Sequence, residues 1–214
     1  MTLLVAGILL GIGVPNVIEF SRSASMTAAA NDFVTAALMA RTEAVKRQAP
    51  VTFCLSDNPT ATPPTCAPGP AFGSLTRGFV VFVDENNNVD ADGARILTDA
   101  TDANGAIDAG ELVLSQYPAP GASSSVRVSA NCGYTMYSPT GFTRRATGAG
   151  PPCWPPDRIV LLCDDRGRRI AAGSLAAARV LRMNRGGRPQ VLSEFADVDS
   201  WVPSFPGSNC NAPP

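Results

Sequence analysis

The stretch MTLLVAGILLGIGVPNVI, residues 1–18, contains no charged side chain, and the first charge of the chain is Glu19. A helix rises about 1.5 Å per residue, so about 20 apolar residues cross the hydrocarbon core of a bilayer. The segment is therefore just long enough to be a membrane anchor or the apolar core of a helical assembly. The residues that we expect to form this membrane or assembly helix are Leu3, Leu4, Val5, Gly7, Ile8, Leu9, Leu10, Gly11, Ile12, Val14 and Pro15.

The helical pattern continues beyond this apolar stretch. Six apolar residues keep the three-and-four spacing of one buried helical face, namely Met26, Ala30, Phe33, Ala37, Ala40 and Ala44. We predict one continuous helix from about Thr2 to Gln48. Residues 1–18 are its transmembrane or filament-core half, and residues 19–48 are its amphipathic half.

A cleaved signal peptide is the alternative for the first segment. Such a peptide has basic residues before its apolar core and small residues before its cleavage site. No basic residue precedes the apolar run here, and the helical pattern continues through Ala28–Ala30. Pro15 costs a backbone hydrogen bond, which membrane helices tolerate better than soluble ones, and Gly7 with Gly11 would let a second helix approach closely. A membrane or assembly helix is the favoured interpretation.

The next part of the chain, residues 49–192, is expected to form a β-rich domain. With 214 residues, 45% of them hydrophobic, the chain can bury one core. Short runs of β-branched and aromatic residues between turn residues predict strands at 51–55, 77–83, 112–114, 125–129, 134–137, 158–163, 179–183 and 190–192. A long helix followed by strands predicts an α+β fold, with the amphipathic half of the helix packed on one face of an antiparallel sheet.

Two segments, one within this domain and one after it, have a different pattern. Ala171–Ala178 is expected to form at most a turn or two of helix. Residues 193–214 contain several prolines, which predicts an extended strap fixed by Cys210.

The six cysteines all follow the first helix: Cys54, Cys66, Cys132, Cys153, Cys163 and Cys210. The chain has no histidine, and most cysteines are far apart, so disulfides in an oxidising compartment are favoured over a zinc site. Cys54 and Cys66 are the favoured pair, because a bridge between them would close the proline-rich loop DNPTATPPT. Three pairings of the other four cysteines remain open.

The formal net charge of −1 results from two opposite patches. Residues 84–111 contain eight acidic residues and one arginine, whereas residues 141–190 contain ten arginines and three aspartates. The acidic stretch resembles a calcium loop, with oxygen ligands at alternate positions and a glycine at the turn. The candidate ligands are Asp84, Asn86, Asn88, Asp102, Asn104, Asp108 and Glu111. An ordinary polar, turn-rich insertion without a cofactor is the alternative.

Several segments occur in the order that a known family of proteins shows. They are 14–16 (VPN), 27–33 (TAAANDF), 40–47 (ARTEAVKR), 50–54 (PVTFC), 78–84 (GFVVFVD), 138–142 (SPTGF) and 162–167 (LCDDRG). In this order the chain resembles the GspH/FimT family of minor pilins and pseudopilins, from Met1 to about Leu192. Family members carry a basic leader, a processing-site glycine and a following glutamate. We expect these to be missing, because the sequence begins inside the apolar segment.

The resemblance implies a pilin-like fold and a minor pilin or pseudopilin function in a type IV pilus or type II secretion system. It implies a subunit held in the bacterial inner membrane by one helix, with its β-rich domain in the periplasm, before assembly into a pilus or pseudopilus. The implied partners are other pilin or pseudopilin subunits and the assembly machinery of the inner membrane.

DNA uptake is an alternative function within the same resemblance. The DNA-binding branch of the family uses a Gly-Arg-x-Arg signature, and the corresponding run here is Gly187-Arg188-Pro189-Gln190, with glutamine in place of one arginine. Arginines in loops are well suited to phosphate oxygens. The candidate DNA contacts are Arg144, Arg145, Arg185 and Arg188.

Catalysis is not expected. The chain has no histidine to act as a base, no nucleophile signature and no glycine-rich phosphate loop. We therefore predict a non-enzymatic protein without a small-molecule substrate. A free periplasmic or surface binding module, released by cleavage of the first helix, is the remaining alternative.

Overall fold

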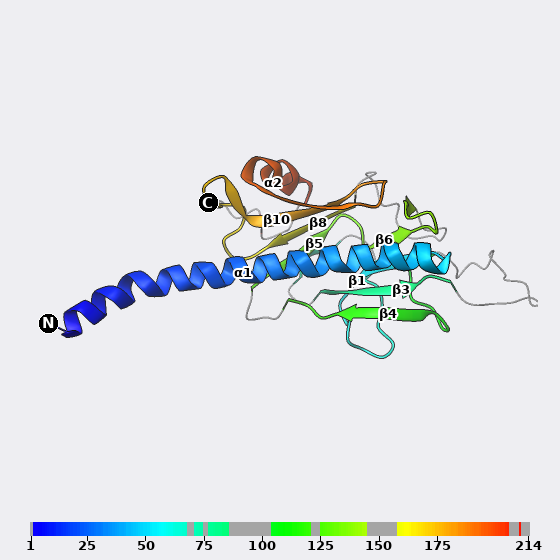
Figure 1. Ribbon diagram of the computed structural model, residues 1–214, viewed down its shortest axis with the longest axis horizontal. Coiled ribbons are helices and arrows are strands. Elements are labelled where there is room, and N and C mark those ends of the chain that lie inside the picture. The colour runs from blue at the N-terminus through cyan, green and yellow to red at the C-terminus, as the bar shows by residue number, and fades with distance from the viewer. Residues whose placement is uncertain are drawn as a thin grey trace, which may run out of the picture.

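The computed structural model describes residues 2–67, 71–74, 77–85, 104–120, 125–144, 158–205 and 210, with the side chains of the first helix described from Val17 onward. Helix α1 (Thr2–Arg47) is the longest element of the molecule, and its N-terminal part projects beyond the β-rich domain (Figure 1). It ends one residue before the predicted Gln48, which has a left-handed φ of 54°. The single long helix expected from the sequence is therefore present.

The strands form two antiparallel sheets. Sheet A has the order β4 (Leu112–Tyr117), β3 (Gly78–Val83), β1 (Val51–Ser56), β6 (Tyr134–Tyr137), β7 (Thr143–Arg144). Sheet B has the order β11 (Pro189–Glu194), β10 (Leu175–Met183), β8 (Arg158–Cys163), β5 (Arg127–Ala130), β2 (Ala71–Ser74), and β9 (Ile170–Ala172) pairs with β10. The expected α+β class, with a long N-terminal helix packed on antiparallel strands, is confirmed, but the expectation of a single sheet was wrong.

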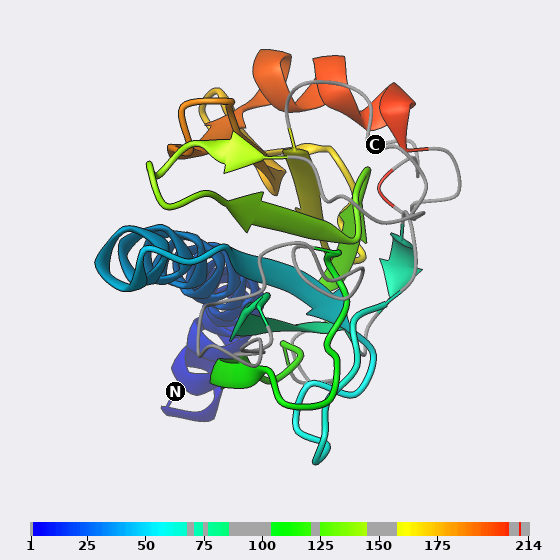
Figure 2. The ribbon, with the colours of Figure 1, turned by 90° about the vertical axis from the view of Figure 1, so that its right-hand side faces the viewer.

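Helix α1 packs against both sheets, as the end-on view of Figure 2 shows. Its buried face is lined mostly by alanines, which let the helix approach the strands closely. Met26 and Phe33 are the large exceptions, and the Phe33 ring meets those of Phe53 and Phe79 edge-on, at centroid distances of 4.9 and 5.5 Å. On the side of sheet B, the same core contains Leu162 and Leu181.

The second face of sheet B is covered by the C-terminal segment. Helix α2 (Phe195–Trp201) and a short 3₁₀ turn (Val202–Ser204) bury Val198, Val202 and Phe205 against β8 and β10. The extended strap expected for residues 193–214 is therefore wrong for this part of the segment, because these apolar side chains recur at a helical spacing and complete a second core.

The helical interpretation of Ala171–Ala178 is also wrong. Strand β9 takes up its first two residues and β10 its last four, and Ala176, Ala177 and Ala178 are buried. Because α1 covers one face of β10 and α2 the other, small apolar side chains fit on both faces of the strand.

Disulfides tie both the loops and the C-terminal segment to strands. The structure joins Cys54 to Cys66, the pair favoured by the sequence, and it joins Cys163 at the end of β8 to Cys210. Cys132 is also disulfide-bonded, whereas Cys153 lies outside the described residues. Cys210 thus fixes the C-terminal segment, as expected from the sequence.

Candidate assembly interface

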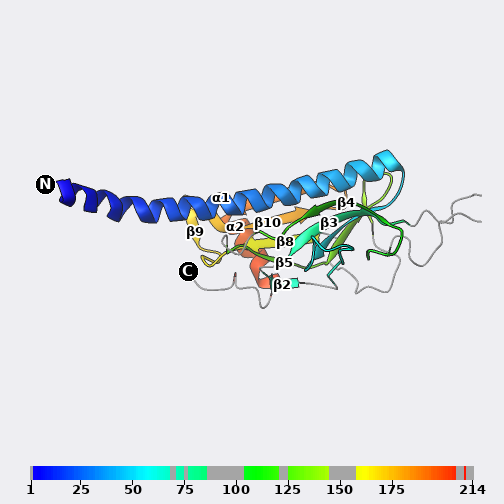
Figure 3. The same cartoon turned by 90° about the horizontal axis from the view of Figure 1, so that it is seen from below.

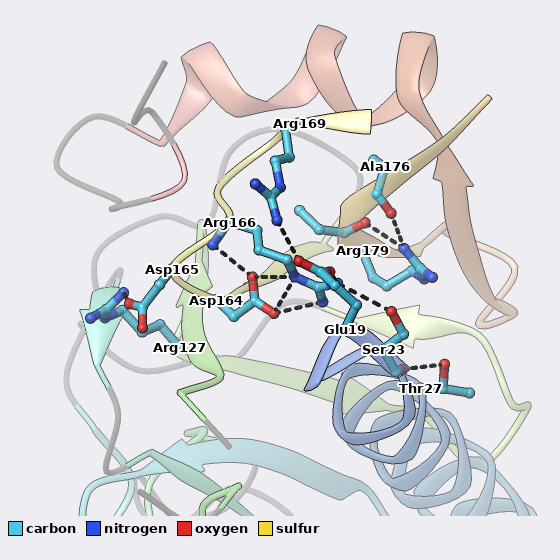
Figure 4. Close-up of polar contacts among 11 residues, drawn as sticks. Glu19, Ser23, Thr27, Arg127, Asp164, Asp165, Arg166, Arg169, Ala176 and Arg179 are labelled. Atoms are coloured by element: carbon cyan, nitrogen blue, oxygen red, sulfur yellow. Dashed lines mark hydrogen bonds and ion pairs between the residues drawn. The ribbon is translucent and has the colours of Figure 1, made fainter. Parts of the chain in front are cut away.

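A cluster of charged residues holds α1 where it leaves the β-rich domain (Figure 4). Arg166, in the turn after β8, donates from Nη1 to Glu19 Oε2 at 3.0 Å and to Ser23 Oγ at 3.1 Å. Arg169 donates from Nη2 to the other oxygen of the same carboxylate, Glu19 Oε1, at 2.7 Å. Two arginines from one turn therefore hold one carboxylate of the helix.

The inner part of this cluster is a buried ion pair. Arg166 donates from Nη2 and Nε to Asp164 Oδ2 at 2.7 and 2.9 Å, and the two side chains are 2% and 1% exposed. Burial lowers the pKa of the Arg166 guanidinium, but its hydrogen bonds to Asp164 and Glu19 and their charges outweigh burial and raise that pKa above its ordinary value. Arg166 is therefore charged, and its position is fixed by both carboxylates.

A second arginine lies beside this pair without a carboxylate of its own among the described residues. Arg179 donates from Nη1 to the backbone oxygens of Ala176 and Ala178. Burial, and then the charge of Arg166, lower the pKa of the Arg179 guanidinium. Arg182, three residues along β10, lies over the ring of Trp201 on the opposite face, so the two arginines do not form one stripe.

The sequence did not reveal the Glu19 cluster. Its local signals are that Glu19 is the first charge after 18 uncharged residues and that Asp164 and Arg166 lie in the segment 162–167, which is part of the resemblance described above. The contact between Glu19 and Arg166 joins residues 147 positions apart, and sequence patterns do not indicate such long-range pairs.

The apolar stretch predicted for membrane or assembly contacts continues α1 beyond the Glu19 cluster. Val17, Ile18 and Phe20 are exposed there, and none of them lies in the described core clusters. The residues predicted from Leu3 to Pro15 lie on the helix, but their side chains are outside the described residues. Within the part of the chain that the structure describes, no helix is long and apolar enough to cross a membrane.

The outer face of the second half of α1 carries a shallow, largely apolar groove. Its lining residues are Thr35, Leu38, Met39, Arg41, Thr42, Val45 and Lys46. Leu38 and Val45 are exposed large apolar side chains, and Arg41 is held by a hydrogen bond from its Nε to the carbonyl oxygen of Gly141. Both halves of the helix thus present apolar surface away from the β-rich domain.

The candidate calcium ligands that the structure describes are used in internal hydrogen bonds. Buried Asp84 accepts from Thr52 Oγ1 and from the backbone N–H groups of Asn104 and Gly105, and Asp108 accepts from the side chain of Asn104. Glu111 accepts from the backbone N–H of Asp108. No group of three acidic, histidine or cysteine side chains gathers among the described residues. Calcium binding stays a prediction, since Asn86, Asn88 and Asp102 lie outside them.

The candidate DNA contacts lie at the other end of the domain from the Glu19 cluster. Thr143 of β7 donates its backbone N–H to the carbonyl oxygen of Arg185, which brings β7 beside the turn between β10 and β11. Arg144, Arg185 and Arg188 are exposed, and none forms an ion pair with a described residue. Arg145 lies outside the described residues.

A comparison with protein families assigns the chain. The model of the family described as type II transport protein GspH matches residues 29–187, which is well over half of the chain. The chain belongs to the GspH family. Its function is therefore that of a minor pilin or pseudopilin, a structural subunit. The GspH match includes the buried face of α1 from Ala29 onward, the Asp164–Arg166 pair and the β10–β11 turn up to Gly187, and it begins after Glu19.

Two solved structures are similar to this GspH-family chain, and both are of the type IV minor pilin FimU from Pseudomonas aeruginosa strain PAO1. The P21 crystal form has a TM-score of 0.44 at 15% identity and covers 81% of this chain and 92% of FimU. The P65 form has a TM-score of 0.40 at 13% identity and covers 78% and 91%. A comparison with curated proteins gives no match.

Proposed function

We propose that this GspH-family subunit is held in the bacterial inner membrane by residues 1–18 and is then assembled, through α1, with other subunits into a pilus or pseudopilus. The observation that carries this proposal is the single continuous helix, whose apolar N-terminal part extends beyond the domain while its second half is buried against both sheets. A rigid rod of this kind couples an apolar anchor directly to the β-rich domain.

The energetics of assembly follow from the composition of residues 1–18. Burying a side chain the size of leucine away from water is worth about 1.5–3 kcal/mol, in lipid as in a bundle of apolar helices. Moving the helix from the membrane into a filament therefore changes this contribution little. Extraction then depends on the assembly machinery of the inner membrane, and the β-rich domain remains outside to provide specific contacts.

The anchor is tested by a charge in the middle of the apolar segment. Leu9→Arg is expected to lower retention of the full chain in carbonate-washed membranes by about 100-fold, because arginine costs about 2.5–3.5 kcal/mol at the centre of a membrane helix. Leu112→Arg, at an exposed leucine of β4, is the matched control and should stay in the membrane. Equal retention of both variants would contradict the proposal.

The assembly face is tested separately, by co-purification with other pilins in detergent. The double variant Leu38→Asp with Val45→Asp is expected to reduce co-purification without changing membrane retention, because it places two charges in the groove on α1. Wild-type protein that is recovered only as a monomer would count against assembly.

A second candidate function, DNA uptake, is favoured by the exposed Arg144, Arg185 and Arg188, which have no acidic partner among the described residues and lie away from the proposed membrane anchor. Arginine donors in this arrangement suit backbone phosphates.

Its test is the salt dependence of duplex DNA binding by the full chain in detergent. Removing two phosphate contacts with Arg185→Ala and Arg188→Ala should lower the slope of log affinity against log salt by about 2. Arg47→Ala, which removes a partially exposed arginine paired with Glu43 on α1, should leave the slope unchanged. DNA uptake is excluded if the wild-type chain does not bind DNA at low salt.

A further inference from the structure

The β9–β10 hairpin lies at the end of the domain from which α1 projects. Arg169, which is hydrogen-bonded to Glu19, directly precedes the first residue of β9, Ile170. Figure 3 shows β9 beside α1 at this end of the domain. The hairpin turns at Gly173, which has a left-handed φ of 59° and no neighbouring atom within 4 Å of the position of a Cβ. The tip of the hairpin is therefore unobstructed.

Exposed apolar side chains lie on this hairpin and on the part of α1 that leaves the domain at the same end. Ile170 at the start of β9 is 54% exposed, and Leu175 at the start of β10 is also exposed. Val17, Ile18 and Phe20 are exposed on the neighbouring part of α1. Single apolar residues on a surface are ordinary, but a group of five at one end, continuous with an apolar helix, indicates an interaction surface.

The charged side chains within residues 166–179 are all arginines, and three of them pair with carboxylates of Asp164, Asp199 and Glu19. Residues 166–179 contain Arg166, Arg168, Arg169 and Arg179 and no acidic residue. The side chains of Arg168 and Arg169 are 33% and 43% exposed, although each has one carboxylate partner. Arginine guanidinium groups bind phosphate oxygens well, and basic residues next to a membrane helix are attracted to anionic lipids. Apolar side chains between arginines are typical of elements that lie at the surface of a bilayer.

We propose that the β9–β10 hairpin is a second membrane contact, which places Ile170 and Leu175 in the headgroup region of the bilayer beside α1, with Arg168 and Arg169 near lipid phosphates. This inference rests on the membrane anchoring of residues 1–18 proposed above. The hairpin fixes the tilt of the domain, because the domain then touches the membrane at two points, α1 and the hairpin.

The test measures tryptophan fluorescence of the full chain in vesicles of phosphatidylethanolamine and phosphatidylglycerol, without bromine, with bromine atoms near the carbonyl end of the acyl chains, which report positions 142, 170 and 175, or with bromine atoms near their methyl end, which report position 10. The variants are Ile170→Trp and, as a second site, Leu175→Trp. Phe142→Trp is the matched control, because Phe142 is 59% exposed at the other end of the domain, next to the hydrogen bond between Arg41 and Gly141. Leu10→Trp reports insertion of the helix.

A tryptophan at position 170 or 175 is expected to lose about half of its emission in brominated vesicles, since interfacial elements lie about 5–10 Å deep. A tryptophan at position 142 should keep its emission, after subtraction of the signal of the native Trp154 and Trp201. If only the tryptophan at position 10 is quenched, the proposed membrane contact of the hairpin is wrong, whereas the proposed anchoring by residues 1–18 still holds. No quenching at position 10 would overturn both, and equal quenching at positions 142 and 170 would overturn the specific contact of the hairpin.

Discussion

Replacing Arg166 with alanine is expected to lower the free energy of unfolding by about 3–5 kcal/mol, because the substitution leaves the buried carboxylate of Asp164 without its cation. The remaining donor to Asp164 Oδ1 is the backbone N–H of residue 166, which does not compensate a full charge. Chemical unfolding of the full chain in mild detergent, followed by circular dichroism, measures the loss. Hydrogen exchange should also increase in α1 near Glu19 and Ser23, which lose the same guanidinium.

Two further variants separate the buried pair from the exposed one. Arg169→Ala removes only the partially exposed pair with Glu19 and is expected to cost at most about 1 kcal/mol. Replacing Asp164 and Arg166 together with leucine removes both charges and should recover most of the stability lost in Arg166→Ala. If the double variant is as unstable as Arg166→Ala, the uncompensated charge is not the cause of the loss.

Asp84 is expected to make the domain less stable as the pH rises from about 4 to 7. Burial raises the pKa of its carboxyl from 3.8 to about 6, against the opposing hydrogen bonds from Thr52, Gly105 and Asn104. A carboxyl group with a raised pKa in the folded state contributes its full stability below its unfolded pKa of 3.8, and this stability is lost as the pH rises through about 6. At 1.36 kcal/mol per pKa unit, the loss is at most about 3 kcal/mol.

The measurement compares the unfolding free energies of wild type and Asp84→Asn from pH 4 to 7. Other carboxylates titrate in both proteins, so the difference between them isolates Asp84, and it should change steadily across this range. A constant difference for Asp84→Asn would mean that its three donors keep the carboxylate ionised. Calcium binding at Asp84 would suppress the pH dependence, because a cation lowers the pKa of its ligands.

The long helix and most of the strands could be predicted because their signals are local. Phe33 and the alanines of the buried face repeat at the helical period, and the runs in β1, β3 and β8 are rich in β-branched or large apolar residues. The Cys54–Cys66 disulfide could also be predicted from a local signal, because only a short proline-rich loop separates the two cysteines.

The rest depends on packing that no local pattern records. Alanine favours helix in isolation, so Ala176–Ala178 appeared helical, but β10 is covered on both faces and packing outweighs this preference. Helix α2 has only seven residues and is followed closely by prolines, so the helical spacing of its apolar residues is too short to recognise in the sequence. The division into two sheets and the contact of Glu19 with Arg166 follow from topology, which brings together residues far apart in the chain.

The fit of Phe33 against Phe53 and Phe79 has a mechanical consequence. A slip of α1 by one turn would move this ring by about 5.4 Å. The ring would lose its contacts with Phe53 and Phe79, and it would clash with strands that now pack against the small alanine side chains of α1. Tension applied to the N-terminal end of the rod therefore passes into both sheets without sliding. We expect a stretched filament to yield at the contacts between subunits before any single subunit deforms.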